Sequence, residues 1–156
     1  MKKLTILMLL VFLCHFTIFS SNTDSLIKSN KKTILGTAKV WQENYNNFKP
    51  DTDLIKALNQ KIENMLRIDI YLGLWCGDSA NNVPKFMKIL NSLDKTIEIN
   101  YYLCKRKKDK KIKFFVEDKN IIKVPTFIFY NKNVEIGRII ENPKKSLLED
   151  FLEIVF

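Results

Sequence analysis

The residues best suited to chemistry in this chain gather around one cysteine. Cys76 lies in the run Trp75-Cys76-Gly77-Asp78-Ser79, directly after Ile68–Leu74, a short apolar stretch rich in strand-forming residues. Apolar residues at helical spacing follow the run, so the pattern predicts a buried strand that turns at Cys76 into a helix. The free N–H groups and the macrodipole at a helix N-terminus stabilise the thiolate, which is the reactive form of cysteine. The sequence therefore predicts a reactive thiol at position 76.

Scarce residue types exclude other kinds of catalysis. The one histidine among the 156 residues, His15, lies in an N-terminal apolar segment that we expect to be removed. A mature chain without histidine cannot form a Ser-His-Asp triad, a cysteine–histidine pair or a histidine zinc site. Two cysteines, Cys76 and Cys104, are too few for a zinc site of four thiolates. We expect neither a metal nor another cofactor.

The chain is basic, with 26 Lys and Arg against 17 Asp and Glu and a net charge of +9. Only three of the basic residues are arginine, the residue preferred for bidentate contacts with bases and phosphates, so we expect no nucleic-acid partner. Most of the excess is a compositional bias toward lysine. The basic stretch 105–111 is either a solvated loop or a surface that attracts acidic partners, because it follows a strand expected to end beside Cys76.

The N-terminus has the pattern of a targeting signal. Lys2 and Lys3 precede the apolar run Leu4–Phe19, and small residues follow at Ser20–Ser21. This order is typical of a secretory signal peptide over residues 1–21, and the run is short for a span of about 20 residues. We expect an exported periplasmic or secreted monomer in an oxidising compartment, with contact to a membrane only if the segment is retained as an anchor.

The rest of the chain divides into a leader with helices and a mixed α/β unit. Residues 22–36 are polar and predict a loose leader. Helical spacing of apolar residues predicts a helix that ends before Pro50 and another that begins at Asp51 or Thr52. The residues that mark these two helices are Trp41, Tyr45, Phe48, Leu54, Ile55, Leu58, Ile62 and Met65. We therefore predict N-terminal helices within residues 22–65.

The elements after residue 66 follow the order β-α-β-(α)-β-β-α, which predicts a mixed sheet with helices on both faces. The strand-like segments after Cys76 are Ile97–Cys104 and the hairpin of Val124–Tyr130 and Val134–Ile140 around Asn131-Lys132-Asn133. The helices are one marked by Val83, Phe86, Met87, Leu90 and Leu93, a short one at Ile112–Val116, and Pro143–Val155 with Asn142 as its cap.

Three motifs in this order resemble the thioredoxin family. The run Trp75-Cys76-Gly77-Asp78-Ser79 looks like the active-site pattern W-C-G-x-C with serine in place of the second cysteine. Pro84 stands where thioredoxins have the proline that kinks the active-site helix. Val124-Pro125-Thr126 resembles their V-P-T segment, whose proline is cis and faces the nucleophilic sulfur. The resemblance covers residues 66–156 and implies a thioredoxin-like fold, with Cys76 as the catalytic thiol.

Departures from the family's pattern bear on the mechanism. Ser79 can donate a hydrogen bond to a thiolate but cannot close a disulfide, so the usual release of a mixed disulfide by a second cysteine is missing. Thioredoxins often bury an aspartate six positions before the cysteine; Ile70 stands there, and Asp69 faces the other side of the strand. Asp78 places a carboxylate near the thiol, which opposes ionisation.

Cys104 ends the strand expected beside Cys76, and two roles remain open for it. It is either a core thiol or a resolving partner for Cys76. Adjacent parallel strands bring both cysteines to one sheet edge, but Cys76 begins a helix above its strand end. We expect the two to lie too far apart for a disulfide without loop movement.

Three functions fit these residues. The first is thiol–disulfide exchange through Cys76, of oxidoreductase or isomerase type, with protein or small-molecule thiols and disulfides as partners. The second is a redox-inactive peptide-binding module in which Trp75 and Pro125 line a groove. The third is a surface or membrane-interaction protein driven by its basic charge. The reactivity of the thiol separates the first two, and the salt dependence of binding would reveal the third.

Overall fold

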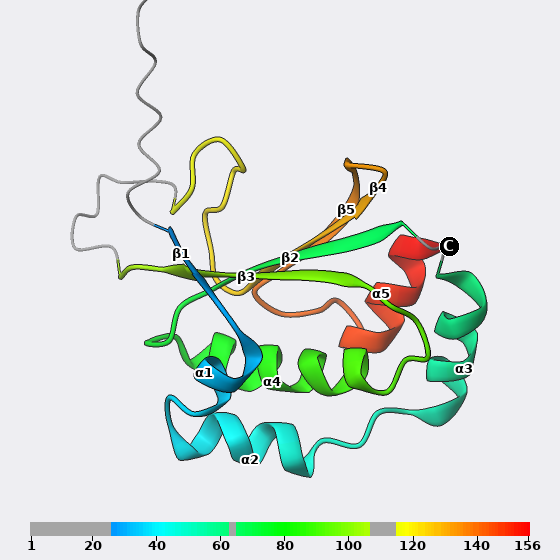
Figure 1. The fold of residues 1–156 in the computed structure, drawn as a ribbon, viewed down its shortest axis with the longest axis horizontal. Helices are drawn as coiled ribbons and strands as arrows, with labels where there is room; N and C mark the ends of the chain where they lie inside the picture. Colours follow the sequence, from blue (N-terminus) through cyan, green and yellow to red (C-terminus); the bar gives the residue numbers. More distant parts are fainter. Residues whose placement is uncertain (1–25, 63–64, 107–114) are drawn as a thin grey trace, which may run out of the picture.

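The computed structural model describes residues 26–62, 65–106 and 115–156, and its centre is a five-stranded mixed sheet (Figure 1). The strands, in the spatial order β1-β3-β2-β4-β5, are β1 (Leu26–Ser29), β2 (Leu66–Leu72), β3 (Glu98–Cys104), β4 (Thr126–Asn131) and β5 (Val134–Ile140). The helices are α1 (Lys31–Leu35), α2 (Lys39–Asn47), α3 (Thr52–Lys61), α4 (Gly77–Asn91) and α5 (Leu147–Val155). The predicted signal segment, residues 1–21, lies outside the described residues.

The register of the sheet brings the ends of β2 and β3 together. These strands are parallel neighbours, and Leu72 near the end of β2 pairs with Leu103. Cys104 therefore lies at the sheet edge from which the chain turns toward Cys76. All other pairings, β1 with β3, β2 with β4 and β4 with β5, are antiparallel. The parallel pair confirms the prediction that the two cysteine-bearing segments meet at one edge.

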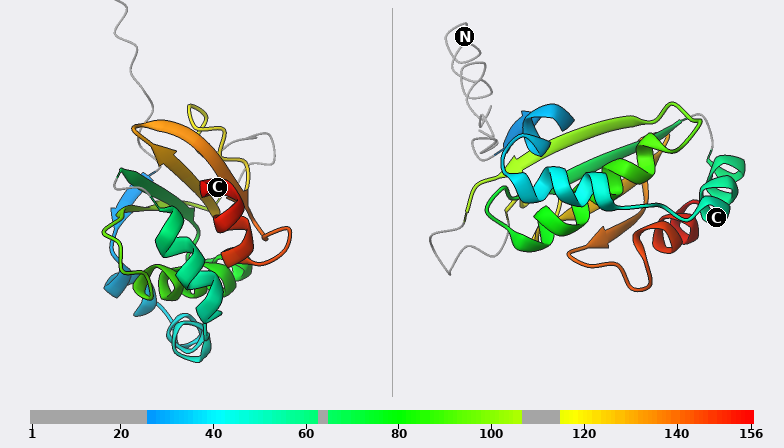
Figure 2. Two further views of the ribbon diagram at one scale, coloured as in Figure 1. Left: turned by 90° about the vertical axis from the view of Figure 1, so that its right-hand side faces the viewer. Right: turned by 90° about the horizontal axis from the view of Figure 1, so that it is seen from below.

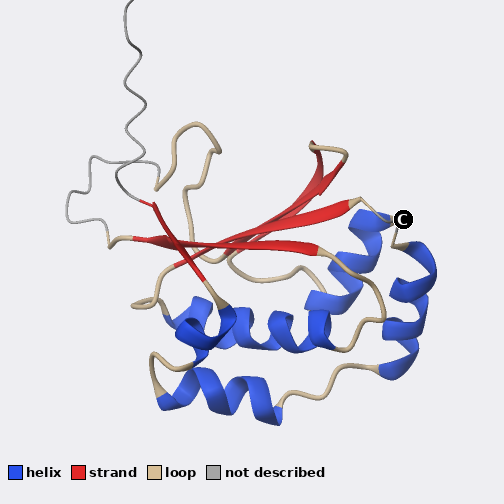
Figure 3. Ribbon diagram, in the orientation of Figure 1, coloured by secondary structure: helices blue, strands red, loops and turns tan. Residues whose placement is uncertain are grey.

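All five described helices lie on the same face of the sheet (Figures 2 and 3). One hydrophobic core joins residues of every helix to Ile68, Ile70 and Leu72 of β2. Its densest part is an aromatic cluster in which Phe86 of α4 contacts Phe127 and Phe151 at ring-centroid distances of 4.7 and 5.6 Å. Such pairs contribute about 0.5–1.5 kcal/mol beyond the area they bury, which fixes α4 firmly against the sheet.

The opposite face, for which the sequence predicts helical cover as well, is covered in the described part of the chain by residues 115–125. This segment contains no helix, and a single β-bridge joins Val116 to Ile121. Beneath it lies a second, smaller cluster that includes Tyr71, Cys104 and Val124. Of the short helix predicted at Ile112–Val116, residues 112–114 lie outside the described ranges, and residues 115 and 116 are not helical.

The N-terminal segment corrects one prediction. The loose leader expected over residues 22–36 is wrong for 26–36, because β1 pairs with β3 as an edge strand and α1 follows it. Ile34 and Leu35 of α1 are buried in the main core. The two helices predicted next are confirmed as α2 and α3, with Asp51 as the cap of α3. The second ends at Lys61, and Met65 is exposed.

The C-terminal helix begins later than predicted. Pro143 and Asn142 precede an irregular turn, and Ser146 caps α5 by accepting a hydrogen bond from the Glu149 N–H. The carboxylate of Asp150 holds the turn by accepting from the backbone N–H groups of residues 144 and 145. The hairpin is confirmed: Lys132 and Asn133 both have positive φ, as a two-residue type I′ turn requires.

Candidate functional site

Cys76 lies at the junction of strand and helix that the sequence predicts. It is the N-cap of α4, with extended backbone, and its carbonyl accepts the first helical hydrogen bond from the Ala80 N–H at 3.0 Å. Its side chain is half-buried, and the thiol donates a hydrogen bond of 3.2 Å to the carbonyl oxygen of Val124. The thiol therefore lies between the positive end of α4 and the loop before β4. Pro84 lies inside α4.

The loop that meets the thiol contains a cis peptide bond between Val124 and Pro125. Both residues are buried, and the Thr126 hydroxyl donates to the carbonyl of Lys123 at 2.8 Å, which closes the turn. This confirms the cis proline that the family resemblance implies. The carbonyl oxygen of Val124 accepts the hydrogen bond of the Cys76 thiol, although the two residues are 48 positions apart in the sequence.

A further set of hydrogen bonds ties this loop back to α4. The Glu141 N–H donates to the Pro125 carbonyl at 2.7 Å, and the Glu141 side chain forms an ion pair with Lys123. The buried side-chain amide of Asn82 donates to the carbonyl of Glu141 at 2.9 Å. Asn82 thus connects the helix that begins at Cys76 to the loop that contacts its thiol.

Glu141 and Asn82 were not singled out from the sequence. Glu141 has a positive φ of 63°, an unusual conformation for a residue other than glycine, and no sequence signal marks it. Asn82 did carry a signal. It lies three residues after Ser79 and four before Phe86, on the apolar face of α4, where a polar side chain needs a buried partner.

Trp75 forms a fixed surface beside the thiol. Its side chain is 44% exposed, yet the indole N–H donates to the carbonyl of Cys104 at 3.1 Å. The ring lies close over Gly73, where an added Cβ would stand only 2.8 Å from the indole. The Phe115 ring lies 6.0 Å away, and the guanidinium of Arg106 lies 5.9 Å from the indole centroid. A large exposed aromatic held in this way offers a preformed contact surface.

The remaining residues of the motif take different roles. Gly77 and Asp78 are exposed in the first turn of α4, and a Cβ at Gly77 would meet nothing within 4 Å. The surface at the start of α4, next to Cys76 in the sequence, is therefore exposed. Ser79 is fully buried, and its oxygen accepts the Gly73 N–H at 3.2 Å. This contact fixes the end of β2 against α4.

Cys104 and Asp69 lie on the face of the sheet opposite the helices. Cys104 is 5% exposed and belongs to the cluster of Tyr71 and Val124, against which Cys76 packs. Within the described residues the two cysteines are not joined by a disulfide. Asp69 is buried beside β3 and accepts from the Asn100 amide at 3.0 Å. Burial first, and then the Asp69 charge, raise the pKa of Tyr71, so its phenol is neutral at physiological pH. The prediction that Asp69 faces away from Ile70 is confirmed.

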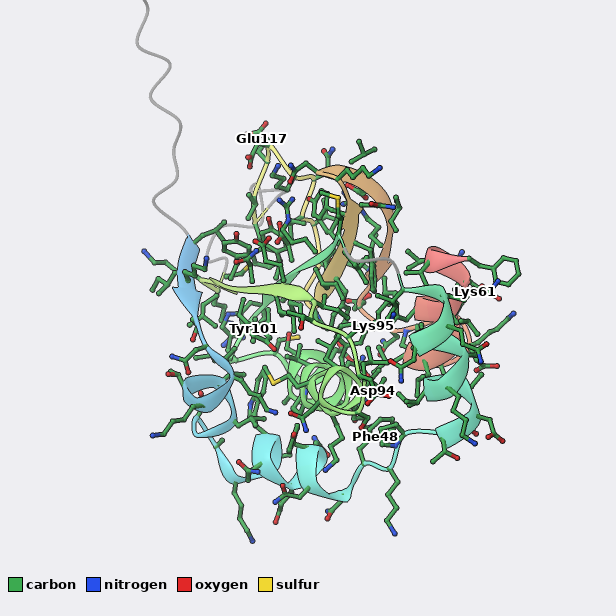
Figure 4. The ribbon with its side chains drawn as sticks, turned by 45° about the vertical axis from the view of Figure 1, so that its right-hand side comes forward. Phe48, Lys61, Asp94, Lys95, Tyr101 and Glu117 are labelled. Carbon is green, nitrogen blue, oxygen red and sulfur yellow. The ribbon has the colours of Figure 1, made fainter. Side chains whose placement is uncertain are left out.

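A cavity lies away from Cys76, between the α2–α3 linker, α4 and the start of α5. It has a volume of about 330 Å³, and Phe48 on the linker borders it (Figure 4). Neither Cys76 nor any other residue of the Trp75–Ser79 motif or of the Val124–Pro125 loop lines it. Within the described ranges, His, Cys, Asp and Glu side chains form no group of three that could hold a metal ion, and no helix is long and apolar enough to cross a membrane.

Comparisons with known proteins agree with this arrangement. The sequence model of a family described as thioredoxin matches residues 27–149. No match was found among curated proteins. The chain is similar in structure to a protein of unknown function from Pseudomonas aeruginosa, with 19% identity and a TM-score of 0.55 over 81% of this chain and 86% of that one. It is also similar to an HIV epitope-scaffold, with 18% identity and a TM-score of 0.54 over 83% of each chain. These structural similarities support the fold.

Proposed function

Because this chain belongs to the thioredoxin family, we propose that it exchanges thiols and disulfides with partner molecules through the single thiol of Cys76. One observation carries the proposal: the Cys76 thiol stands at the N-terminus of α4 and is directed at the carbonyl before the cis proline. The helix N-terminus stabilises the thiolate that attacks a disulfide. The side chain of Cys76 is only half-buried, so a partner can reach it.

The reaction requires one bond to form and one to break. The Cys76 thiolate attacks a sulfur of a partner disulfide R–S–S–R′, forms Cys76–S–S–R and releases R′–S⁻. A thiolate from outside the chain then attacks the mixed disulfide and frees Cys76. Ser79 cannot supply that second thiol, and its oxygen is occupied by the Gly73 N–H. Cys104 is buried, so its service as a resolving thiol would require the segment over it to move.

A redox-inactive peptide-binding module is the second candidate. The observation that favours it is the exposed but immobilised indole of Trp75 next to the Val124–Pro125 loop. Such a surface can hold an extended chain with no thiol chemistry. The two candidates differ in one measurable property, the reaction of Cys76 with disulfides on the native fold.

Trapping at Cys76 tests the proposal. The native protein is incubated with a small disulfide, quenched with acid and digested. The mass of the peptide that contains Cys76 then shows whether the thiol of the probe has been added. We expect a Cys76 mixed disulfide to form on the folded protein faster than on the protein unfolded in urea. The Cys76→Ala variant is the control, because it leaves only Cys14 and the buried Cys104. Negligible reaction of Cys76 on the native fold would support the binding module instead.

We further propose that the protein acts after export, because the N-terminal pattern of Lys2, Lys3 and the apolar run Leu4–Phe19 is that of a signal peptide. Intact-mass measurement of the protein recovered from the cell envelope is the test. Loss of residues up to Ser20–Ser21 in a soluble fraction is the expected result. Recovery of the full chain in the membrane fraction would instead make the segment an anchor.

A further inference from the structure

A cation stands on the surface beside the Cys76 thiol. Arg106, two residues after the end of β3, is exposed, and its guanidinium lies 5.9 Å from the centroid of the Trp75 indole. A cation at this distance from an indole face is attracted by the ring quadrupole. Lys105, the residue before it, is exposed as well. The C-terminal end of β3 thus places positive charge next to the aromatic surface that borders the thiol.

The indole that holds Arg106 near the thiol is itself well fixed. Its N–H bonds to the Cys104 carbonyl, and its ring packs over Gly73. Trp75 is also the residue before Cys76 in sequence. A polypeptide bound at Cys76 can therefore lie against the exposed indole, with the residues that flank its own cysteine in reach of Arg106.

Two acidic residues near Cys76, Glu141 and Asp78, bear on the positive charge of Arg106 and Lys105 in different ways. Glu141 forms an ion pair with Lys123 beside the cis proline, so these two charges neutralise each other. Asp78 is exposed in the first turn of α4, on the side of Cys76 that continues into the helix. Arg106 and Lys105 lie on the side of Trp75. The whole chain adds its net charge of +9, which favours the approach of anions over longer distances.

We propose that Trp75 and Arg106 form a recognition surface that makes Cys76 selective for disulfides of polypeptides with acidic residues next to the cysteine. This inference rests on the proposed exchange function and names its partner class. The indole supplies apolar contact to the peptide, and Arg106 pairs with the carboxylate that flanks the bound cysteine. The reaction is the attack already described, in which Cys76–S–S–R forms and R′–S⁻ leaves.

The test uses three symmetric disulfides of blocked tripeptides, Glu-Cys-Glu, Gln-Cys-Gln and Lys-Cys-Lys, with the full-length protein. The rate of Cys76 modification is read from the mass of the Cys76 peptide, and each rate is divided by that for the urea-unfolded chain. This ratio removes differences in the intrinsic reactivity of the disulfides. Glutathione disulfide serves as a fourth probe, because it is anionic but lacks the acidic neighbours on both sides.

We expect the acidic peptide to react fastest and the basic one slowest. Two unit charges about 6–7 Å apart in water change a rate by roughly threefold, so Arg106→Gln should slow the acidic peptide by about threefold and leave the neutral peptide unchanged. Lys56→Gln on α3 removes the same charge far from the thiol and should change no rate (Figure 1). Salt at 1 M should abolish the differences, because the Debye length falls to about 3 Å.

The outcomes separate the two proposals. Equal rates for the three tripeptides, or an equal effect of Arg106→Gln on all of them, would overturn the acidic preference and leave the exchange function standing. If glutathione disulfide reacts as fast as the acidic peptide, the site prefers small anionic disulfides in general. The claim that its partners are polypeptides would then be overturned. If Cys76 reacts with none of the probes, the exchange function fails and this inference fails with it.

Discussion

Replacing Gly73 with alanine should displace the Trp75 indole. An added Cβ at position 73 would stand 2.8 Å from Cε2 of the indole, about 0.7 Å inside ordinary carbon–carbon contact. Gly73 does not have a positive φ, so the backbone accepts alanine and the strain falls on the tryptophan. A shift of that size lengthens the 3.1 Å hydrogen bond from the indole to the Cys104 carbonyl beyond bonding distance.

The expected cost follows from these contacts. Overpacking costs about 1–3 kcal/mol. Replacing glycine by alanine also stabilises the fold by about 0.4–1 kcal/mol, because it lowers the conformational entropy of the unfolded chain. Because the indole is half-exposed it can swing outward, so we expect a net loss near the lower end, about 1 kcal/mol. Gly77→Ala is the matched control: it meets open space and should gain about 0.5 kcal/mol.

Urea unfolding and tryptophan fluorescence measure both effects. The only other tryptophan, Trp41, is 1% exposed, so an increase in iodide quenching reports on Trp75. We expect Gly73→Ala to lower the free energy of unfolding and to raise quenching, while Gly77→Ala does neither. Equal stability of the two variants with unchanged quenching would refute the packing argument.

Three further predictions test other parts of the structure. Asn82→Ala should cost about 1–3 kcal/mol and change the alkylation rate of Cys76, because it removes the donor to the Glu141 carbonyl that braces the Pro125 loop. Asn47→Ala, at an exposed position on α2, should do little, and equal effects of the two variants would contradict the role of Asn82. Burial raises the pKa of Tyr101 (Figure 4) to about 12, so between pH 10 and 12 the unfolded chain loses a proton that the native chain keeps, and stability falls with rising pH. Tyr101→Phe should reduce that fall by up to about 1.4 kcal/mol per pH unit in urea titrations, and an unchanged slope would count against it. Asp150→Ala should cost about 2 kcal/mol in the same assay, because two backbone N–H groups before α5 lose their acceptor, and Asp150→Asn, which keeps one oxygen, should cost less.

Local sequence signals were enough to predict the strand and the helix that position the Cys76 thiol. The apolar strand, the turn at Cys76 and the amphipathic helix after it are each encoded within about 25 adjacent residues, and α4 begins where the pattern predicts. The hairpin of β4 and β5 follows in the same way, because its turn residues act over a short distance. The parallel pairing of β2 with β3 was predicted from the family resemblance and not from a local signal. The motif Val124-Pro125-Thr126 also marked the loop that meets the thiol.

Contacts between segments far apart in the sequence determined the features that the local signals did not predict. β1 is a strand of only four residues, two apolar and two polar, and it forms because the edge of β3 is available to pair with it. α5 begins at Leu147 and not at Pro143, because the Asp150 carboxylate accepts the N–H groups of the preceding turn. The hydroxyl of Ser79, the bracing amide of Asn82 and the orientation of Trp75 each depend on a partner reached through folding. A one-dimensional pattern identifies which residues can react, but hydrogen-bond partners far along the chain determine where their side chains point.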